Sequence, residues 1–316
     1  MLEKMIIGID LGGTKINTVL ADRSGNIKAR DVRDTLARDG PGVVIERMVE
    51  AIRSVTDGSE IEGIGIGAAG ACDTAKGIVT HSPNLLDWHY IPLKGEIQRY
   101  FDVPTYLEND ATVAALGEYR FGGYEGIDNL IYISVGTGIG GGIIINGQLY
   151  SGTSGSAGEV GHMTIDINGI KCPCGNTGCW ETLASGTAMA REAVKRIQAG
   201  EQTTILDFSD GELDKVDGKS IYAAAEKGDR LANELIQQTG YYLGVGLVNL
   251  VDIFNPQLIL IGGGLSQMGT VLLDHANKVV NERAFKLPAQ AVSIQTARLG
   301  TDSTALGAVA LVLKSG

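Results

Sequence analysis

Apolar residues along this chain fall into two kinds of pattern. Residues 6–10 and 16–21 are short runs rich in β-branched side chains, and a Gly-Gly pair lies between them. Such runs predict two neighbouring strands joined by a turn. From residue 41 to residue 55 the apolar positions recur with helical spacing, which predicts an amphipathic helix. Strand-like and helix-like segments then alternate, and this order favours the α/β class.

The later elements are predicted in the same way. Strands are predicted at residues 61–67, 105–107, 130–135, 143–146 and 257–261. Helices are predicted at residues 93–100, 110–119, 232–252, 271–281 and 304–314. We expect the last helix to pack back on the N-terminal domain. Small residues inside the 232–252 helix permit close packing, either within the chain or between subunits.

The chain contains a weak internal repeat. Residues 130–146 repeat the order of strand, Gly-Thr turn and strand that begins the chain. Two copies of such a unit suggest a duplicated fold with a ligand in the cleft between them. We therefore predict a smaller domain of residues 1–118 plus 302–316 and a larger domain of residues 119–301.

Composition and charge narrow the possible functions. The chain has 316 residues, with 26 Lys and Arg against 37 Asp and Glu, so its net charge is −11. Non-specific nucleic-acid binding needs a basic surface, which this composition does not provide. No apolar run is long enough to predict a membrane span, and the N-terminus does not have the pattern of a signal peptide. We expect a cytoplasmic protein without nucleic-acid or membrane partners.

Three of the four cysteines lie close together in the sequence. With His162 they form the pattern His-x9-Cys-x-Cys-x4-Cys, whose cysteines are Cys172, Cys174 and Cys179. Three thiolates and one imidazole are a tetrahedral donor set for Zn²⁺. We predict a structural zinc site, and the alternative is a group of buried free thiols. Cys72 lies apart and is expected to be a core or loop thiol.

The segment Asp10-Leu11-Gly12-Gly13-Thr14-Lys15 joins the first two predicted strands. Glycines let a bulky anion approach the backbone, and successive N–H groups can bind it. Lys15 adds a positive charge, and Asp10 could hold Mg²⁺ through water. The segment predicts a phosphate-binding turn, although Gly-Gly is also common in ordinary tight hairpins.

Two further glycine-rich segments follow predicted strands. Residues 136–142 contain a G-x-G-x-x-G match, but a strand rather than a helix follows it. This order excludes a dinucleotide-binding turn and predicts a loop and hairpin that contact phosphate. Residues 262–264 lie at the end of a strand, where α/β folds bind ligands, or they form a simple strand-to-helix turn.

Acidic residues in two places could take part in chemistry. Glu108-Asn109-Asp110 ends a strand and begins a helix, so Asp110 could cap the helix or accept a proton from a substrate hydroxyl. Glu159 and Glu181 flank the Cys/His motif. They could bind sugar hydroxyls together with His162, or they could support the zinc ligands.

Taken together, these motifs resemble the ROK family (repressor, open reading frame, kinase), and most of all its bacterial-type glucokinases. The resemblance covers nearly the whole chain, and the Cys/His stretch ending at Glu181 is its most specific part. It implies a two-domain α/β fold of the actin/hexokinase-like (ribonuclease H-like) type, with nucleotide and sugar in the interdomain cleft. The motifs are residues 10–15, 82–84, 108–110, 136–142, 158–162, 172–181 and 262–264.

The resemblance also implies the reaction and its residues. ATP with Mg²⁺ would phosphorylate the 6-hydroxyl of a hexose, with glucose the first expectation and Asp110 the general base. The implied sugar-binding residues are Gly70, Asn84, Asn109, Asp110, Glu159, His162 and Glu181. The implied phosphate and Mg²⁺ residues are Asp10, Gly12, Gly13, Thr14, Lys15, Thr137, Gly138, Gly263 and Gly264. Ala69 stands before Gly70 where many members have Pro, and we expect the backbone contact to sugar at this loop to be kept.

Other functions within the resemblance stay open. The same motifs would serve a kinase of N-acetylmannosamine, N-acetylglucosamine, fructose or mannose. The repressors of the family carry an added N-terminal helix-turn-helix, for which the sequence before Asp10 leaves no room. A non-catalytic sugar sensor would not need Asp110 and Lys15. The resemblance also implies a homo-oligomer, a dimer or tetramer, while the phosphoryl donor and preferred hexose are not given by the sequence.

Overall fold

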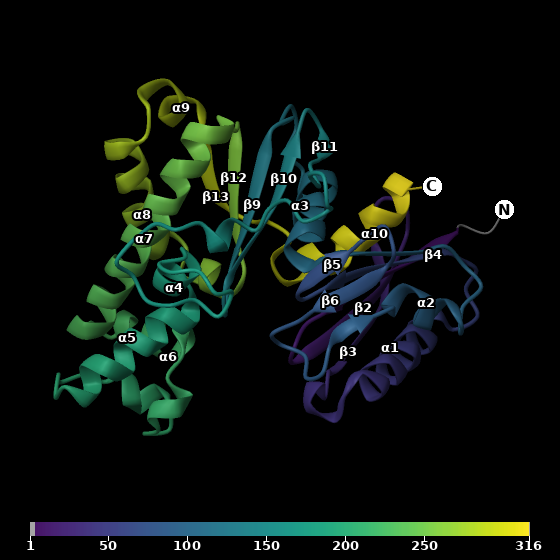
Figure 1. Ribbon diagram of the computed structural model, residues 1–316, viewed down its shortest axis with the longest axis horizontal. Helices are drawn as coiled ribbons and strands as arrows, with labels where there is room; N and C mark the ends of the chain where they lie inside the picture. Colours follow the sequence, from purple (N-terminus) through teal and green to yellow (C-terminus); the bar gives the residue numbers. More distant parts are fainter. Residues whose placement is uncertain (1–3, 316) are drawn as a thin grey trace. The chain divides into compact units, whose positions relative to one another are not determined.

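The computed structural model describes residues 4–315 of the chain, which form two compact units (Figure 1). The first unit consists of residues 4–132, 142–158 and 297–315, and the second of residues 133–141 and 159–296. The predicted domain boundaries at residues 118 and 301 stay predictions. Among residues 4–315, no helix is both long enough and apolar enough to cross a membrane.

The first five-stranded sheet has the strand order β3-β2-β1-β4-β8. Its strands are β1 (Met5–Leu11), β2 (Lys15–Ala21), β3 (Ile27–Asp34), β4 (Ile61–Ala68) and β8 (Thr105–Asn109). Tight turns join β1, β2 and β3 as antiparallel neighbours, whereas β4 and β8 run parallel to β1. Parallel neighbours need long crossovers, and the longer connections before β4 and β8 provide them. The carboxyl ends of β1, β4 and β8 therefore meet at one edge of the sheet.

Helices cover both faces of this sheet (Figure 1). On one face lie α1 (Pro41–Thr56) and α2 (Leu93–Gln98), whose apolar residues share a core with alternate residues of β1. On the other face lie α3 (Asp110–Phe121) and α10 (Ser303–Ser315). Gly8 and Gly65 allow α10 to lie directly on the strands, since a Cβ at either would collide with backbone carbonyls of the helix. The prediction that the last helix packs on the N-terminal strands is confirmed.

A small antiparallel sheet extends the first unit. It consists of β5 (Ala71–Asp73), β6 (Ile78–His81) and β7 (His89–Ile91), in the order β5-β6-β7. The connection 82–88 between β6 and β7 is anchored by Leu85 and Trp88, which are 3% and 0% exposed. This anchored connection carries Asn84.

The second five-stranded sheet has the order β11-β10-β9-β12-β13. Its strands are β9 (Leu130–Val135), β10 (Ile139–Ile145), β11 (Gln148–Leu149), β12 (Leu258–Gly262) and β13 (Ser293–Thr296). The predicted glycine loop 136–142 is wrong in extent, because β10 already begins at Ile139. Gly142 lies inside this strand. The position needs glycine because a Cβ there would collide with Ala115 of α3. The predicted strand at 143–146 also ends one residue early, since Asn146 adopts a left-handed turn conformation with φ 51°.

The remaining helices belong to the second unit. They are α4 (Glu181–Ala184), α5 (Gly186–Gln198), α6 (Gly218–Glu226), α7 (Arg230–Phe254), α8 (Thr270–Arg283) and α9 (Lys286–Ala291). Figure 1 shows α7 and α8 side by side, and Gly240 and Gly244 of α7 face α8 closely. Gly246 faces the indole ring of Trp180. These small residues of the long helix therefore serve packing within the chain. Short 3-10 helices lie at Ala37–Asp39, Val160–His162, Ile205–Phe208, Leu213–Lys215, Gly264–Met268 and Gly300–Asp302.

Candidate active site and metal centre

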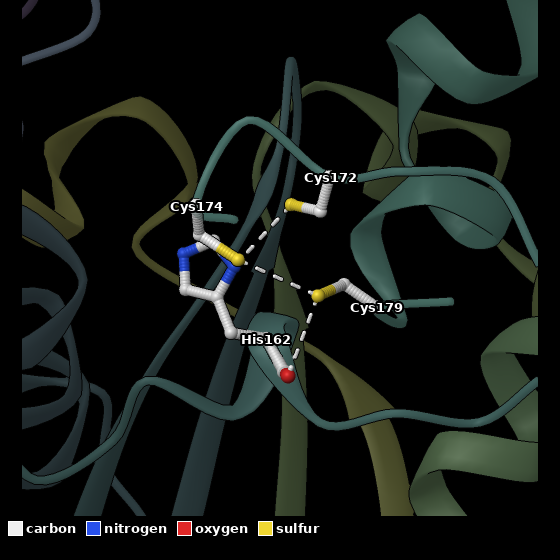
Figure 2. A group of neighbouring side chains, drawn as sticks. All are labelled: His162, Cys172, Cys174 and Cys179. Carbon is white, nitrogen blue, oxygen red and sulfur yellow. Dashed lines mark hydrogen bonds between the residues drawn. The ribbon is translucent and has the colours of Figure 1, made fainter. Parts of the chain in front are cut away.

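The four predicted metal ligands come together in the second unit. Figure 2 shows the side chains of His162, Cys172, Cys174 and Cys179 turned toward one another. One ligand atom from each lies within 4.8 Å of all the others. Cys174 Sγ is 3.6 Å from Cys179 Sγ, and Cys172 Sγ is 3.8 Å from His162 Nδ1. Two sulfurs bound to one tetrahedral Zn²⁺ at about 2.3 Å lie about 3.8 Å apart. The donor set and its spacing therefore fit zinc.

Tight turns bring the three thiols together. Cys172 N donates to Asn176 O at 2.8 Å, and Gly175 N donates to Cys172 O at 3.0 Å. Gly175 and Gly178 have φ values of 96° and 67°, which side-chain-bearing residues rarely adopt. A Cβ at Gly178 would also collide with the carbonyl of Asp166. The glycines are thus required by the loop that presents the thiols.

The thiols of the cluster differ in their acidity. Burial raises the pKa of Cys172 and of Cys179, so both thiols hold their protons more tightly than usual. The backbone N–H of Asn176 lowers the pKa of the more exposed Cys174. Because Zn²⁺ binds thiolates, loading the cluster would release protons. Four protein ligands would fill the coordination sphere, which is typical of a structural site.

Two carboxylates flank the imidazole of His162 on opposite sides. Glu181 Oε1 lies 3.4 Å from Nδ1, while Glu159 Oε2 lies 3.9 Å from Nε2. Nδ1 therefore faces the thiols, and Nε2 faces away from them toward Glu159. The other oxygen of Glu181 lies against Gly138, where a Cβ would approach it within 2.6 Å. The structure thus groups four predicted site residues in the second unit: Gly138, Glu159, His162 and Glu181.

A second pair of acidic residues lies in the first unit, at the sheet edge where parallel strands end. Asp10 belongs to the end of β1, and Asp110 is the first residue of α3. Gly67 of β4 lies beside Asp10 in the sheet, and a Cβ built there would be 3.6 Å from the Cα of Asp110. Burial, followed by the negative charge of Asp110, raises the pKa of Asp10 to about 7. A cation shared by such a pair would lower the cost of ionising both.

The residue that caps α3 differs from Asp110, the cap that the sequence suggested. Asn109, rather than Asp110, caps the helix, because Asn109 Oδ1 accepts from Ala111 N at 3.0 Å and Thr112 N at 3.1 Å. Asn109 Nδ2 also donates to Gly70 O at 3.0 Å, which ties two predicted sugar-binding residues together. Asp110 Oδ1 accepts from Ala111 N at 2.8 Å. The positive end of the helix dipole favours the ionised form of Asp110.

Two hydrogen bonds hold the predicted phosphate turn between β1 and β2 in place. Gly12 N donates to Lys15 O at 3.0 Å, and Thr35 Oγ1 donates to Gly12 O at 2.7 Å. The side chains of Thr14 and Lys15 are exposed. Asn84 leaves no room for a side chain at Gly13, since a Cβ there would lie 2.7 Å from the Cβ of Asn84. The turn therefore contacts the connection 82–88 that holds another predicted sugar ligand.

The two later glycine segments are explained in part by packing. Gly136 accepts a hydrogen bond from Gly186 N at 2.7 Å, which joins the turn before β10 to the start of α5. Gly263 has φ 78° and lies so close to Val135 of β9 that no side chain would fit. Thr137 and Gly264 have no such constraint, because Thr137 is exposed and a Cβ at Gly264 would enter open space. Phosphate contact by these residues stays a prediction.

The sequence predicted no role for two carboxylates near α3 that are buried in the structure. Glu118 of α3 is fully buried and accepts hydrogen bonds from Ser303 Oγ at 2.7 Å and Leu299 N at 2.9 Å. It thereby fixes the segment that leads into α10. Glu108 at the end of β8 is 5% exposed, and burial raises its pKa to about 7. Glu118 lies in a segment whose sequence looks like an ordinary helix, and Glu108 is marked only as the first residue of the 108–110 motif, so the sequence does not reveal that either carboxylate is buried.

Comparison with known proteins places this arrangement in a family. The model of the ROK family matches residues 6–315. A glucokinase of Thermotoga maritima is 35% identical over 312 residues, covering 99% of this chain and 98% of the relative. A xylose repressor of Caldicellulosiruptor bescii is 35% identical over 319 residues, covering 98% of this chain and 78% of the repressor.

A solved structure agrees in fold as well as sequence. The crystal structure of a ROK family glucokinase from Streptomyces griseus, in complex with glucose and AMPPNP, has a TM-score of 0.88 to this chain. Its sequence identity is 36%, and the match covers 98% of this chain and 99% of the other. The expected two-domain α/β fold of the hexokinase-like type, with two mixed five-stranded sheets, is thereby confirmed. This chain belongs to the ROK family.

Proposed function

We propose that this chain is an ATP-dependent hexose kinase that phosphorylates the 6-hydroxyl of glucose. The pair formed by Asp10 and Asp110 carries the proposal. Phosphoryl transfer is mostly positioning and charge stabilisation, and it needs a metal-binding carboxylate and a group that orients the attacking hydroxyl. The full-length similarity to glucokinases supports glucose as the acceptor.

Asp110 is assigned as the general base. Its place at the start of α3 favours the carboxylate form, and the N–H of Ala111 orients one of its oxygens. A carboxylate held in this way can orient a sugar hydroxyl and accept its proton as the new bond to phosphorus forms. The proton leaves the attacking oxygen and moves to Asp110, while the bond between the γ-phosphorus and the bridging oxygen of ATP breaks and ADP leaves.

Asp10 is assigned to Mg²⁺, which it would hold directly or through water. Mg²⁺ bound with ATP neutralises the negative charge on the phosphate oxygens. The raised pKa of Asp10 fits this role, because a cation next to it favours ionisation. The phosphate contacts are assigned to Gly12, Gly13, Thr14, Lys15, Thr137, Gly138, Gly263 and Gly264.

Sugar hydroxyls are assigned to hydrogen-bond acceptors and donors among the predicted site residues. Asn109 uses one amide hydrogen for Gly70 O, and the geometry of an amide leaves it a second hydrogen to donate. Zn²⁺ bound by Nδ1 of His162 would place the remaining ring hydrogen on Nε2, beside Glu159. The assigned residues are Gly70, Asn84, Asn109, Asp110, Glu159, His162 and Glu181.

The experiment is ADP release from Mg·ATP with glucose, mannose, fructose, N-acetylglucosamine and N-acetylmannosamine. Asp110→Asn should lower kcat about 10²- to 10⁴-fold with glucose, because the isosteric amide cannot accept the proton. Asp274→Asn, an exposed change on α8, is the matched control and should leave kcat unchanged.

The outcomes separate the related functions. If the enzyme preferred an N-acetylhexosamine or fructose, the proposed mechanism would stand and the proposed substrate would change. Full activity of Asp110→Asn would show that Asp110 is not the general base. Absence of turnover on every sugar, with sugar binding retained in calorimetry, would favour a sensor of the kind found among the family's repressors. Homo-oligomerisation stays a prediction.

A further inference from the structure

Two histidines outside the metal centre face each other across the small sheet. His81 ends β6 and His89 begins β7, and the antiparallel register places them directly opposite each other. Nδ1 of one ring lies 3.4 Å from Nδ1 of the other. The rings are nearly parallel, with an interplanar angle of 17°, and both side chains are exposed to solvent. Neither residue has a part in the proposed phosphoryl transfer.

The separation of the two nitrogens is that of two ligands on one ion. Imidazole nitrogens bind Zn²⁺ at about 2.0–2.1 Å, so two of them in tetrahedral positions lie about 3.3–3.4 Å apart. Without an ion, one ring must donate an N–H to the other, because two neutral acceptor nitrogens or two N–H donors would repel. An ion bound by both nitrogens satisfies them together.

The backbone holds the pair in a defined position. Trp88, the residue before His89, is completely buried, and His89 N donates to Asp87 O at 3.1 Å. Asp87 and Tyr90 have left-handed φ values of 60° and 54°, which are strained for residues other than glycine. A site on a strand pair that packing fixes loses little entropy when it binds an ion.

We propose that His81 and His89 bind a divalent first-row transition-metal ion. Imidazole ligands suit Zn²⁺, Ni²⁺ and Cu²⁺, whereas Mg²⁺ and Ca²⁺ prefer oxygen. Within residues 4–315, only the cluster around His162 has three or more close His, Cys, Asp or Glu side chains. The remaining ligands at the histidine pair are therefore water, and binding there is reversible and weaker than in the thiolate cluster. The ion joins the two ends of the connection 82–88, which holds Asn84.

The test is titration of the zinc-loaded full chain with Ni²⁺ in a calorimeter. A thiolate-rich tetrahedral cluster favours Zn²⁺, so zinc content measured before and after shows that the first site is unchanged. One Ni²⁺ should bind per chain. Mutation of a residue that only supports a metal ligand lowers metal affinity about 10- to 100-fold. Because the histidines are proposed as direct ligands, His81→Asn or His89→Asn should lower Ni²⁺ affinity at least about tenfold. His275→Asn, on α8 and outside both sites, is the matched control and should bind as the wild type does.

A second measurement needs no variant. Paramagnetic Ni²⁺ broadens the NMR signals of the nuclei nearest to it, so the ring signals of His81 and His89 should disappear before those of His162 and His275. Equal Ni²⁺ affinity in the wild type and in the His81→Asn, His89→Asn double variant would overturn the proposal. It would also be overturned if the wild type gave no binding heat, or if the signals of His275 broadened first.

Discussion

Asp10 and Asp110 are one hundred residues apart in the chain, yet the charge of Asp110 adds to burial in raising the pKa of Asp10 to about 7. The fold produces this proximity, because β1 and β8 run in the same direction and α3 begins where β8 ends. Two like charges so close are costly without a cation. For this reason the proposed reaction places Mg²⁺ and the reacting hydroxyl at this pair.

Asp10→Asn should weaken the response to Mg²⁺ more than the binding of sugar. The amide keeps the shape of the carboxyl group but removes its charge, and Mg²⁺ prefers charged oxygen ligands. We expect the Mg²⁺ concentration for half-maximal rate to rise about tenfold or more, with little change in the glucose Kd. A Mg²⁺ titration of the rate and calorimetry with glucose measure the two quantities. An unchanged Mg²⁺ dependence would contradict the assignment of Asp10.

Glu108→Gln should make the free energy of unfolding less dependent on pH. Burial raises the pKa of Glu108 from 4.5 to about 7, so the folded chain binds this proton more tightly than the unfolded chain. Stability from this group is present below about pH 4.5 and is lost as the pH rises toward about 7. The neutral glutamine avoids that loss, and we expect a gain of roughly 1–3 kcal/mol at pH 8 that vanishes near pH 4. Denaturant unfolding at several pH values measures it, with the exposed Glu46→Gln as control.

Gly13→Ala should disturb the phosphate turn although the φ of Gly13 is ordinary. The added Cβ would lie 2.7 Å from both Cβ and the carbonyl oxygen of Asn84, so the turn and the connection 82–88 must move apart. We expect kcat/KM to fall about 10²-fold, since a displacement of about 1 Å in a positioning group has effects of that size. Gly95→Ala in α2 is the matched control, because its Cβ enters open space. Equal kinetics for both variants would show that the turn does not position a reacting group.

The sequence predicted the segments at the carboxyl ends of β1 and β8, but not the cap of α3 or the extent of β10. The turn after β1 and the Asp110 region could be placed because apolar periodicity marks the strands and helices around them. Asn109 and Asp110 are both good helix caps, so the sequence alone could not decide which of them caps α3. The glycines of residues 139–142 looked like a loop, because the sequence does not reveal that α3 lies against the strand. His81 and His89 could not be paired beforehand, since the register of two short strands depends on the connection between them.

Removal of zinc should impair stability and sugar binding together. Cys172→Ser replaces a buried thiolate ligand by a poor one, and the resulting chain should contain less than one Zn²⁺. We expect a loss of about 4 kcal/mol or more in the free energy of unfolding, because a bound zinc ion would link His162 to the loop that carries the thiols. The glucose KM should rise more than the ATP KM, since His162 and Glu181 lie at the cluster. Cys72→Ser changes another buried thiol outside the cluster, so it should lower stability without changing zinc content. A Cys172→Ser chain that keeps its zinc and its glucose KM would contradict the four-ligand site.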